Sequence, residues 1–241
     1  MEASRVSGIL GLLPIPAAAV DALAEFVTAP VPRSLVRAET ASLIEVADNG
    51  EDLVELPQHF PQRILYDDLD LPSRPGVFVR RAVLDRLEVA RASLPSAFDL
   101  VVIDAWRSSA FQQALREFYA RGHDVSADYV ASSADPRLRA GHTTGGAVDV
   151  TLSWRGLPLA LGTHYDVFDQ IAHPEYFDDF ADESLSAQER ASRDARRLLG
   201  AVMVSAGFAP YPFEWWHWSF GDQWWAAYMQ EPHAIYDTTT T

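Results

Sequence analysis

The chain has 241 residues, of which 48% are hydrophobic and 22% charged, and it contains no cysteine. These proportions are those of a globular protein with a substantial core, and they exclude a disulfide framework. Its 34 acidic and 19 basic side chains give a formal net charge of -15, so nucleic acid and anionic membrane surfaces would be repelled. We therefore expect one domain that does not bind nucleic acid.

Residues 1–20 contain a short apolar run followed by alanines, which is similar to a signal peptide only in outline. Glu2 lies in the charged end, and Pro14 and Pro16 interrupt the apolar segment, which argues against export. No apolar run approaches the roughly 20 residues that a membrane-spanning helix needs. We expect a cytoplasmic protein without a membrane span.

Only short elements are predicted in the first third of the chain. Hydrophobic residues at helical spacing predict a helix over residues 20–27, which two prolines end. Residues 36–71 are acidic and irregular, with short strands expected at 42–46 and 63–66. We expect residues 1–75 to form an N-terminal extension that packs on the core.

The next segment predicts a helix, a buried strand and a second helix. Residues 79–94 have the apolar spacing of an amphipathic helix, and residues 98–104 form a buried-strand candidate. Ser109 and Gln112 form a capping-box pattern, which predicts a helix from there to about Ala120. The side chains expected on its buried face are Phe111, Leu115 and Phe118.

A loop over residues 129–136 leads to a predicted strand over residues 147–152. Side chains alternate between the two faces of a strand, so Asp149 lies in a polar row and the valines lie in an apolar row. We expect only the apolar row to be core. Asp149 can then face a site without lying in a dry interior.

The last third of the chain predicts one long helix. Ser186 and Glu189 form a capping box that opens it, and Gly207 follows its end. An aromatic strand is expected around residues 215–220 and a short helix around 224–229. The threonine tail should be frayed.

Histidines and acids gather in two segments. His142 is followed by two glycines and by Asp149, and a second segment carries His217 three residues after Glu214. Three imidazole or carboxylate ligands with an open fourth position are typical of catalytic zinc. The alternative is a hydrogen-bonded pair of structural histidines. Because residues three apart face opposite sides of a regular strand, Glu214 and His217 share a site only at a bulge or at the mouth of a strand.

These residues lie in ordered blocks that resemble the zinc D-alanyl-D-alanine dipeptidases, within the wider group of zinc D,D-carboxypeptidases. Each block alone is a weak signal, whereas the ordered set is specific. The resemblance spans roughly residues 98–220. The blocks are Asp104-Ala-Trp-Arg107-Ser, His142-x-x-Gly-x-Ala-x-Asp149-x-Thr-Leu, Glu214-Trp-Trp-His217 and a weaker Leu161-Gly-Thr-His-Tyr-Asp166.

The resemblance implies a role for each matching position. His142, Asp149 and His217 correspond to the family's zinc ligands, with one zinc ion per chain, and Glu214 corresponds to its catalytic base. The implied substrate is a small peptide, a D,D-dipeptide such as D-Ala-D-Ala. Zinc would activate water for amide hydrolysis with the help of this base.

The resemblance also implies groups that recognise substrate. Arg107 corresponds to the residue that stabilises the developing oxyanion, although it can instead form a salt bridge with Asp104. Asp166 corresponds to the acid that holds the substrate's ammonium group, or it caps a turn. The family usually has a serine where this chain has Ala140, which leaves the dipeptide specificity open. Tyr66 is a candidate for the family's early substrate-binding tyrosine.

The implied fold is a single α+β domain in which a small antiparallel sheet, flanked by helices, carries the zinc site. We expect a catalytic domain over residues 76–232 and a tail over 233–241. Two alternatives to a dipeptidase stay open: a zinc D,D- or L,D-carboxypeptidase or endopeptidase that trims peptidoglycan stem peptides, and a non-catalytic zinc-containing binding module. Glu214 and Arg107 argue against the module, because a purely structural site needs neither.

Overall fold

The computed structural model describes residues 12–26, 29–64, 66, 71, 76–120, 126 and 128–240. Its centre is a five-stranded antiparallel sheet with the strand order β4-β5-β8-β7, in which β6 also pairs with β5. The strands are β4 (Phe98–Asp104), β5 (Ala147–Trp154), β6 (Leu157–Pro158), β7 (Ala209–Pro210) and β8 (His217–Ser219).

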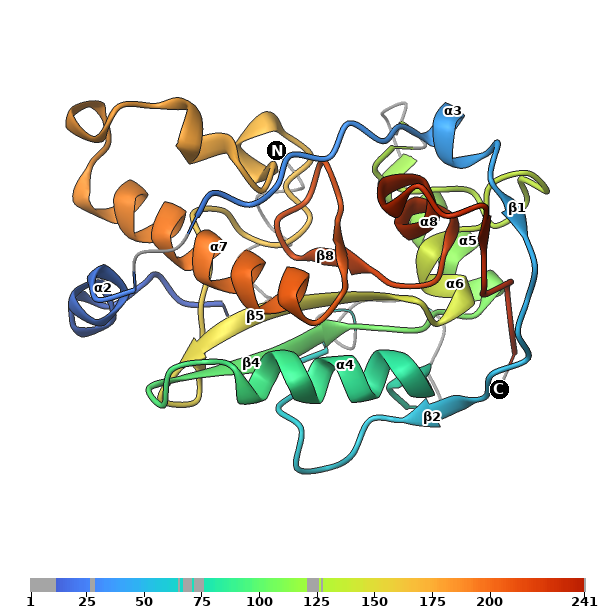
Figure 1. Cartoon of the computed structure of the whole chain (residues 1–241), viewed down its shortest axis with the longest axis horizontal. Helices are drawn as coiled ribbons and strands as arrows, with labels where there is room; N and C mark the ends of the chain where they lie inside the picture. Colours follow the sequence, from blue (N-terminus) through green and yellow to red (C-terminus); the bar gives the residue numbers. More distant parts are fainter. Residues whose placement is uncertain are drawn as a thin grey trace.

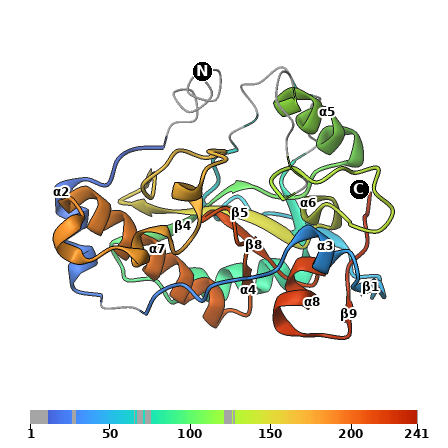
Figure 2. The same ribbon diagram turned by 90° about the horizontal axis from the view of Figure 1, so that it is seen from above.

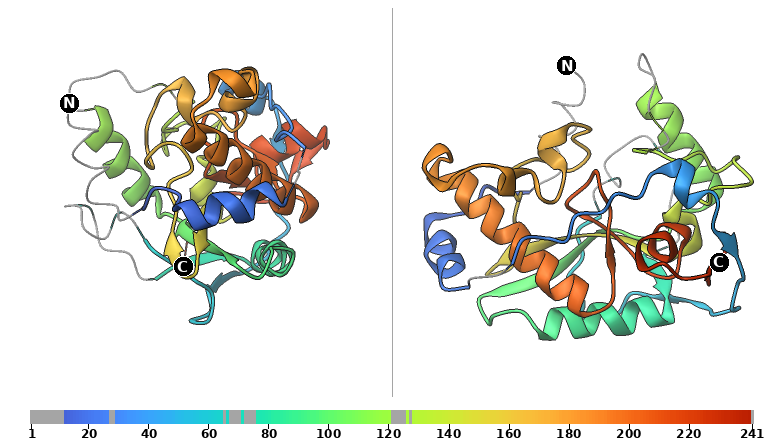
Figure 3. Two further views of the ribbon diagram at one scale, coloured as in Figure 1. Left: turned by 90° about the vertical axis from the view of Figure 1, so that its left-hand side faces the viewer. Right: turned by 45° about the horizontal axis from the view of Figure 1, so that its top comes forward.

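Helices cover the sheet from two sides. Helices α4 (Arg81–Ala92) and α7 (Ala187–Ser205) contact each other and lie over one face of β4 and β5 (Figure 1). Helix α5 (Ser109–Ala120) lies on the other side, as the view from above shows (Figure 2). Helix α2 (Ala17–Ala24) runs beside α7 (Figure 3). The sheet is therefore enclosed on both faces.

Shorter elements complete the fold around this layer. Two small sheets join distant segments, because β1 pairs with β9 in parallel and β2 pairs with β3 in antiparallel fashion. The short strands and helices are β1 (Glu45–Val46), β2 (Leu53–Glu55), β3 (Phe78–Arg80), β9 (His233–Ala234), α3 (Ala38–Ala41), α6 (Gly141–Thr144), α8 (Gln223–Met229), η1 (Gln170–Ala172), η2 (Tyr176–Asp179) and η3 (Asp182–Ser184).

The fold class is confirmed as α+β, with the antiparallel sheet flanked by helices. The strand over 98–104 and the long helix opened by Ser186 and Glu189 are also confirmed, and both hydrogen bonds of that capping box are present. The predicted helix over 79–94 is α4, although its first two residues belong to β3. Among the described residues, no helix is long and apolar enough to cross a bilayer.

The prediction that only one face of the 147–152 strand is core is wrong. All eight residues of β5 are buried, and Asp149 and Thr151 are 1% and 0% exposed. The Thr151 hydroxyl is satisfied there because it donates to the carbonyl oxygen of Leu159, 2.6 Å away. Asp149 therefore lies in a largely water-free interior, where its charge has to be balanced by nearby groups.

Three other local predictions need correction. The strand expected at 42–46 is reduced to β1, because the single-turn helix α3 and a turn occupy the residues before it. No strand forms over the described part of 63–66, and Leu65 is outside the described residues. The residue before this range, Gln62, makes one bridge to Val102. The strand around 215–220 is only β8, since Trp215 and Trp216 lie in a turn.

Two helix ends and the tail also differ from expectation. Helix α2 starts directly after Pro16, and its expected end at Val27 is outside the described residues. Helix α5 is capped by Ser108 rather than Ser109, because the Phe111 amide donates to the Ser108 hydroxyl oxygen. The tail is tied down instead of frayed, since the Thr239 amide donates to the carbonyl oxygen of Thr143.

A buried arginine fixes the loop that follows the sheet. Arg196 of α7 is 2% exposed and donates to the carbonyl oxygens of Leu161, Ile171 and His173 at 2.7, 2.9 and 2.8 Å. Burial lowers the pKa of its guanidinium to about 9. The side chain thus joins the long helix to both ends of the segment that contains Asp166.

Replacing Arg196 with Met should destabilise the protein much more than the same change at Arg197. Arg196→Met leaves three buried carbonyl groups without their donor, which should lower the free energy of unfolding by about 3 kcal/mol or more. Arg197 makes a partly exposed pair with Asp178, so Arg197→Met should cost less than about 1 kcal/mol. Urea denaturation of the three proteins measures both differences. Equal losses would contradict this role of Arg196.

Candidate active site

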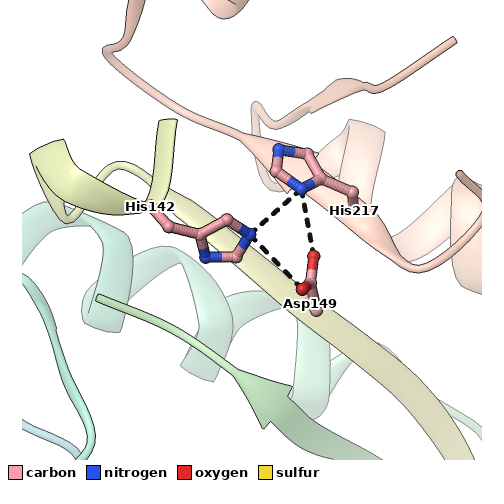
Figure 4. Close-up of side chains that lie close together, drawn as sticks. All are labelled: His142, Asp149 and His217. Carbon is pink, nitrogen blue, oxygen red and sulfur yellow. Dashed lines mark hydrogen bonds and ion pairs between the residues drawn. The ribbon is translucent and has the colours of Figure 1, made fainter. Parts of the chain in front are cut away.

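Three separate elements bring His142, Asp149 and His217 together. His142 lies on α6, Asp149 on β5 and His217 on β8, where Asp149 and His217 are direct cross-strand partners (Figure 4). His142 Nε2 is 3.2 Å from His217 Nδ1 and 3.3 Å from Asp149 Oδ2, and His217 Nδ1 is 3.0 Å from Asp149 Oδ1. One ligand atom from each residue can therefore contact a single ion.

The two glycines after His142 allow this approach. Gly145 ends α6 in the left-handed conformation with φ +74°, and a Cβ there would clash with a side-chain methyl group of Leu53. At Gly146, a Cβ would lie 2.5 Å from the carbonyl oxygen of Phe220. The chain can thus turn from the helix directly into β5 only with small residues at these positions.

The arrangement of donors and acceptors fits a cation. His142 Nδ1 is 2.7 Å from the carbonyl oxygen of Ala105, so its proton lies on Nδ1 and Nε2 presents a lone pair to the site. Burial lowers the pKa of His217, which favours its neutral form. Asp149 Oδ1 is buried without a hydrogen-bond partner. Two imidazole nitrogens and one carboxylate are a donor set that suits zinc.

Charge interactions also distinguish Asp149 from an ordinary buried acid. Burial by itself would raise its pKa, but His142 and His217 outweigh this effect and hold the pKa well below its ordinary value. The carboxyl group is therefore ionised and acts only as an acceptor.

Glu214 reaches the site from the turn that precedes β8. Its backbone carbonyl accepts a hydrogen bond from the His217 amide, and its Oε2 lies 3.8 Å from His217 Nδ1. The side chain is 5% exposed, and burial followed by repulsion from Asp149 and Asp166 raises its pKa well above the ordinary value. The position at the mouth of the strand explains how two residues three apart share one site.

Arg107 both pairs with Asp104 and reaches the site. Its Nε donates to Asp104 Oδ2 at 2.5 Å and its Nη1 donates to Gln112 Oε1 at 3.0 Å. Nη2 points the other way, 3.5 Å from Asp149 Oδ2 and 3.4 Å from the Tyr66 hydroxyl oxygen. Burial alone would lower the pKa of Arg107, but the attraction of Asp104 outweighs burial, and the pKa is raised. The salt bridge therefore orients a permanent cation toward the site.

Asp166 lies at the other end of the same cavity. Its backbone is left-handed, with φ +57°, and its Oδ2 accepts hydrogen bonds from the hydroxyl groups of Tyr66 at 2.7 Å and Tyr119 at 2.5 Å. Burial raises the pKa of Asp166 to about 7. Tyr66, considered from the sequence, is thus in contact with the predicted acid.

Tyr119 and Tyr165 are residues that the sequence analysis missed. Tyr119 follows Leu115 by four residues on α5, a spacing that places both on one helix face, and like Phe118, which was expected there, it is half-buried. Tyr165 donates from its hydroxyl to Asp149 Oδ2 at 2.6 Å. It immediately precedes Asp166, and no pattern in the sequence distinguishes it from a core aromatic residue.

A cavity that is partly open to solvent connects these groups. Its polar side contains the three clustered residues together with Arg107, Glu214 and Asp166. Its walls are mostly aromatic, and Ala140 contributes a methyl group where a hydroxyl was expected. The aromatic lining residues are Tyr66, Tyr119, Tyr129, Phe168, Tyr211 and Trp224.

Comparison with known proteins agrees with this arrangement. The family described as D-Ala-D-Ala dipeptidase matches residues 68–237. The D-alanyl-D-alanine dipeptidase of Synechocystis sp. is 30% identical over 191 residues, which cover 68% of this chain and 77% of that protein. Proteins of the same name match over shorter stretches. That of Streptomyces coelicolor is 34% identical over 39% of this chain and 40% of its own, and that of Enterococcus faecalis is 29% identical over 43% and 45%.

The match extends from before β3 to after β9 and includes all the residues that line the cavity except Tyr66. The resemblance found in the sequence blocks is therefore confirmed over a longer range than those blocks alone. The chain belongs to the D-Ala-D-Ala dipeptidase family.

Proposed function

We propose that this protein is a zinc-dependent dipeptidase that hydrolyses a D,D-dipeptide such as D-Ala-D-Ala. The observation that supports it best is the convergence of His142, Asp149 and His217 in a cavity that also contains Glu214 and Arg107. We propose one zinc ion per chain, held by the two histidines and Asp149. The names of the related proteins point to the same substrate.

Hydrolysis requires a base, an activated carbonyl and a proton for the leaving amine. A bound zinc ion lowers the pKa of water and polarises a carbonyl group. Glu214 takes the proton from the attacking water and delivers it to the nitrogen of the leaving amine. Its raised pKa makes it a stronger base than a solvated glutamate. Arg107 Nη2 stabilises the carbonyl oxygen as it becomes negative.

Asp166 provides the selection for a short substrate. The ammonium group of a dipeptide can pair with its carboxylate, while Tyr66 and Tyr119 hold that carboxylate in place. A longer stem peptide has an uncharged amide at this position and would leave the buried carboxylate without a cation to balance its charge. This difference favours a dipeptidase over a carboxypeptidase or endopeptidase.

A hydrolysis assay of the zinc-loaded protein tests the proposal. D-Ala-D-Ala should be cleaved with a higher kcat/KM than L-Ala-L-Ala or a stem pentapeptide. Faster cleavage of the pentapeptide would favour the carboxypeptidase, and stoichiometric zinc without turnover of any peptide would favour a binding module. Because Ala140 cannot offer a hydroxyl to the substrate's carboxylate, the assay should include D,D-dipeptides with different second residues.

Measurements of metal content and turnover on the same variants should distinguish the metal ligands from the catalytic base. His217→Ala removes a nitrogen ligand and should lose stoichiometric zinc. Glu214→Gln keeps the size of the side chain but removes its basicity, so it should keep zinc and lose about 10²-fold or more in kcat. Metal analysis after dialysis and steady-state kinetics give both values. Near-wild-type kcat for Glu214→Gln would rule out the base.

The preference for a free amine should depend on pH through Asp166. The quantity to measure is the ratio of kcat/KM for D-Ala-D-Ala to that for N-acetyl-D-Ala-D-Ala, because any effect of Glu214 is common to both substrates. The pKa of Asp166 is about 7, so its carboxylate forms and the ratio rises as the pH increases through that value. At pH 7.5 the ratio should be at least about tenfold.

Asp166→Asn is the matched control, since it keeps the shape of the side chain and has no charge to titrate. Its ratio should be small and independent of pH between about 5.5 and 7.5, below the titration of the substrate's own amine. If wild type and variant discriminate equally at every pH, another group recognises the amine.

A further inference from the structure

The two oxygens of Asp149 have different surroundings. Oδ2 accepts a hydrogen bond from the Tyr165 hydroxyl at 2.6 Å and lies 3.5 Å from Arg107 Nη2. Oδ1 is buried, has no hydrogen-bond partner, and lies 3.0 Å from His217 Nδ1. Each oxygen faces one imidazole nitrogen, since His142 Nε2 lies 3.3 Å from Oδ2, but the hydroxyl and guanidinium donors both contact Oδ2.

This difference between the two oxygens determines which of them can bind a metal ion. A carboxylate oxygen has two lone pairs, and the donors from Tyr165 and Arg107 use those of Oδ2. Oδ1 has neither of these donors and lies beside His217 Nδ1. A metal ion held with the histidines would therefore be bound by one oxygen of Asp149 instead of two.

Tyr165 is placed to act on Asp149 and not on substrate. Its side chain is 1% exposed and is absent from the cavity lining, and its ring packs against Trp216 at 5.2 Å and Tyr66 at 5.6 Å. The next residue, Asp166, has a left-handed backbone and lines the cavity. The Tyr165 hydroxyl contacts Asp149 and does not line the cavity. Substrate cannot contact the Tyr165 hydroxyl in this arrangement.

We propose that Tyr165 is a positioning residue for the metal site: its hydroxyl holds Oδ2 of Asp149 so that Oδ1 alone binds the metal, and this hydrogen bond sets the metal affinity. The inference rests on the proposed zinc site. It assigns to the residue before Asp166 a role different from that of Asp166 itself, since one acts on the metal ligand and the other on the substrate.

Tyr165→Phe tests the inference, with Tyr66→Phe as its matched control. Each variant loses one hydroxyl that donates to a buried aspartate, but Tyr165 donates to Asp149 and Tyr66 donates to Asp166. Competition between the metal-free proteins and a chromophoric chelator measures the Kd for Zn²⁺. Tyr165→Phe should bind Zn²⁺ at least about tenfold more weakly than wild type, and Tyr66→Phe should bind it as wild type does.

The visible spectrum of the Co²⁺-substituted proteins gives a second readout at saturating metal, where affinity no longer matters. Tyr165→Phe should shift the ligand-field bands, because Oδ2 becomes free to approach the ion, and Tyr66→Phe should reproduce the wild-type spectrum. A general loss of stability would affect both variants alike, so it cannot produce this contrast.

Three outcomes overturn the inference. Wild-type Zn²⁺ affinity with a wild-type Co²⁺ spectrum in Tyr165→Phe would show that the hydrogen bond does not position the ligand. An equal loss of affinity in Tyr66→Phe would show that the effect is not specific to Asp149. Wild-type protein that does not bind Zn²⁺ would overturn the proposed site as well, which distinguishes failure of the proposed function from failure of this inference.

Discussion

The burial of negative charge around one arginine is the constraint on which the site depends. Arg107 contacts two buried carboxyl groups, Asp104 and Asp149, and its charge lowers the pKa of two more. The four are at most 9% exposed: Asp104, Asp149, Asp166 and Glu214. A divalent metal ion and the ammonium group of a substrate would bring this group to neutrality. With the proposed metal and a substrate with a free amine both bound, the charges of the cavity would be balanced. The raised pKa values of Asp166 and Glu214 express the same excess of negative charge.

Much of this arrangement could be predicted from the sequence, because local signals mark it. The capping box at Ser186, the apolar strand before Arg107 and the glycines after His142 each determine local structure through a few neighbouring residues. The ordered blocks then indicated which side chains meet, although they are far apart in the chain. The structure adds the distances, and with them the reason why Glu214 and His217 can share a site.

The features that were missed depend on tertiary contacts. Alternation in β5 predicted a solvated row for Asp149, but Leu159 and Tyr165, from the segment that follows β6, contact Thr151 and Asp149 on that face, and periodicity cannot place that segment. Tyr119 and Tyr165 have the pattern of core aromatic residues, and only their hydroxyl partners distinguish them. The cap at Ser108 shows the usual uncertainty of one residue at a helix end.

The hydrogen bonds that hold α6 in place have a consequence for how the site is assembled. Thr143 and Thr144, next to His142, are held by residues from distant parts of the chain: Thr239 donates to the carbonyl oxygen of Thr143, and Arg80 donates to those of Thr144 and Asp237. The one-turn helix that carries the histidine has too few hydrogen bonds to persist alone. His142 therefore takes its place beside Asp149 and His217 only when segments that are distant in the sequence have packed around α6, so tertiary contacts assemble the site.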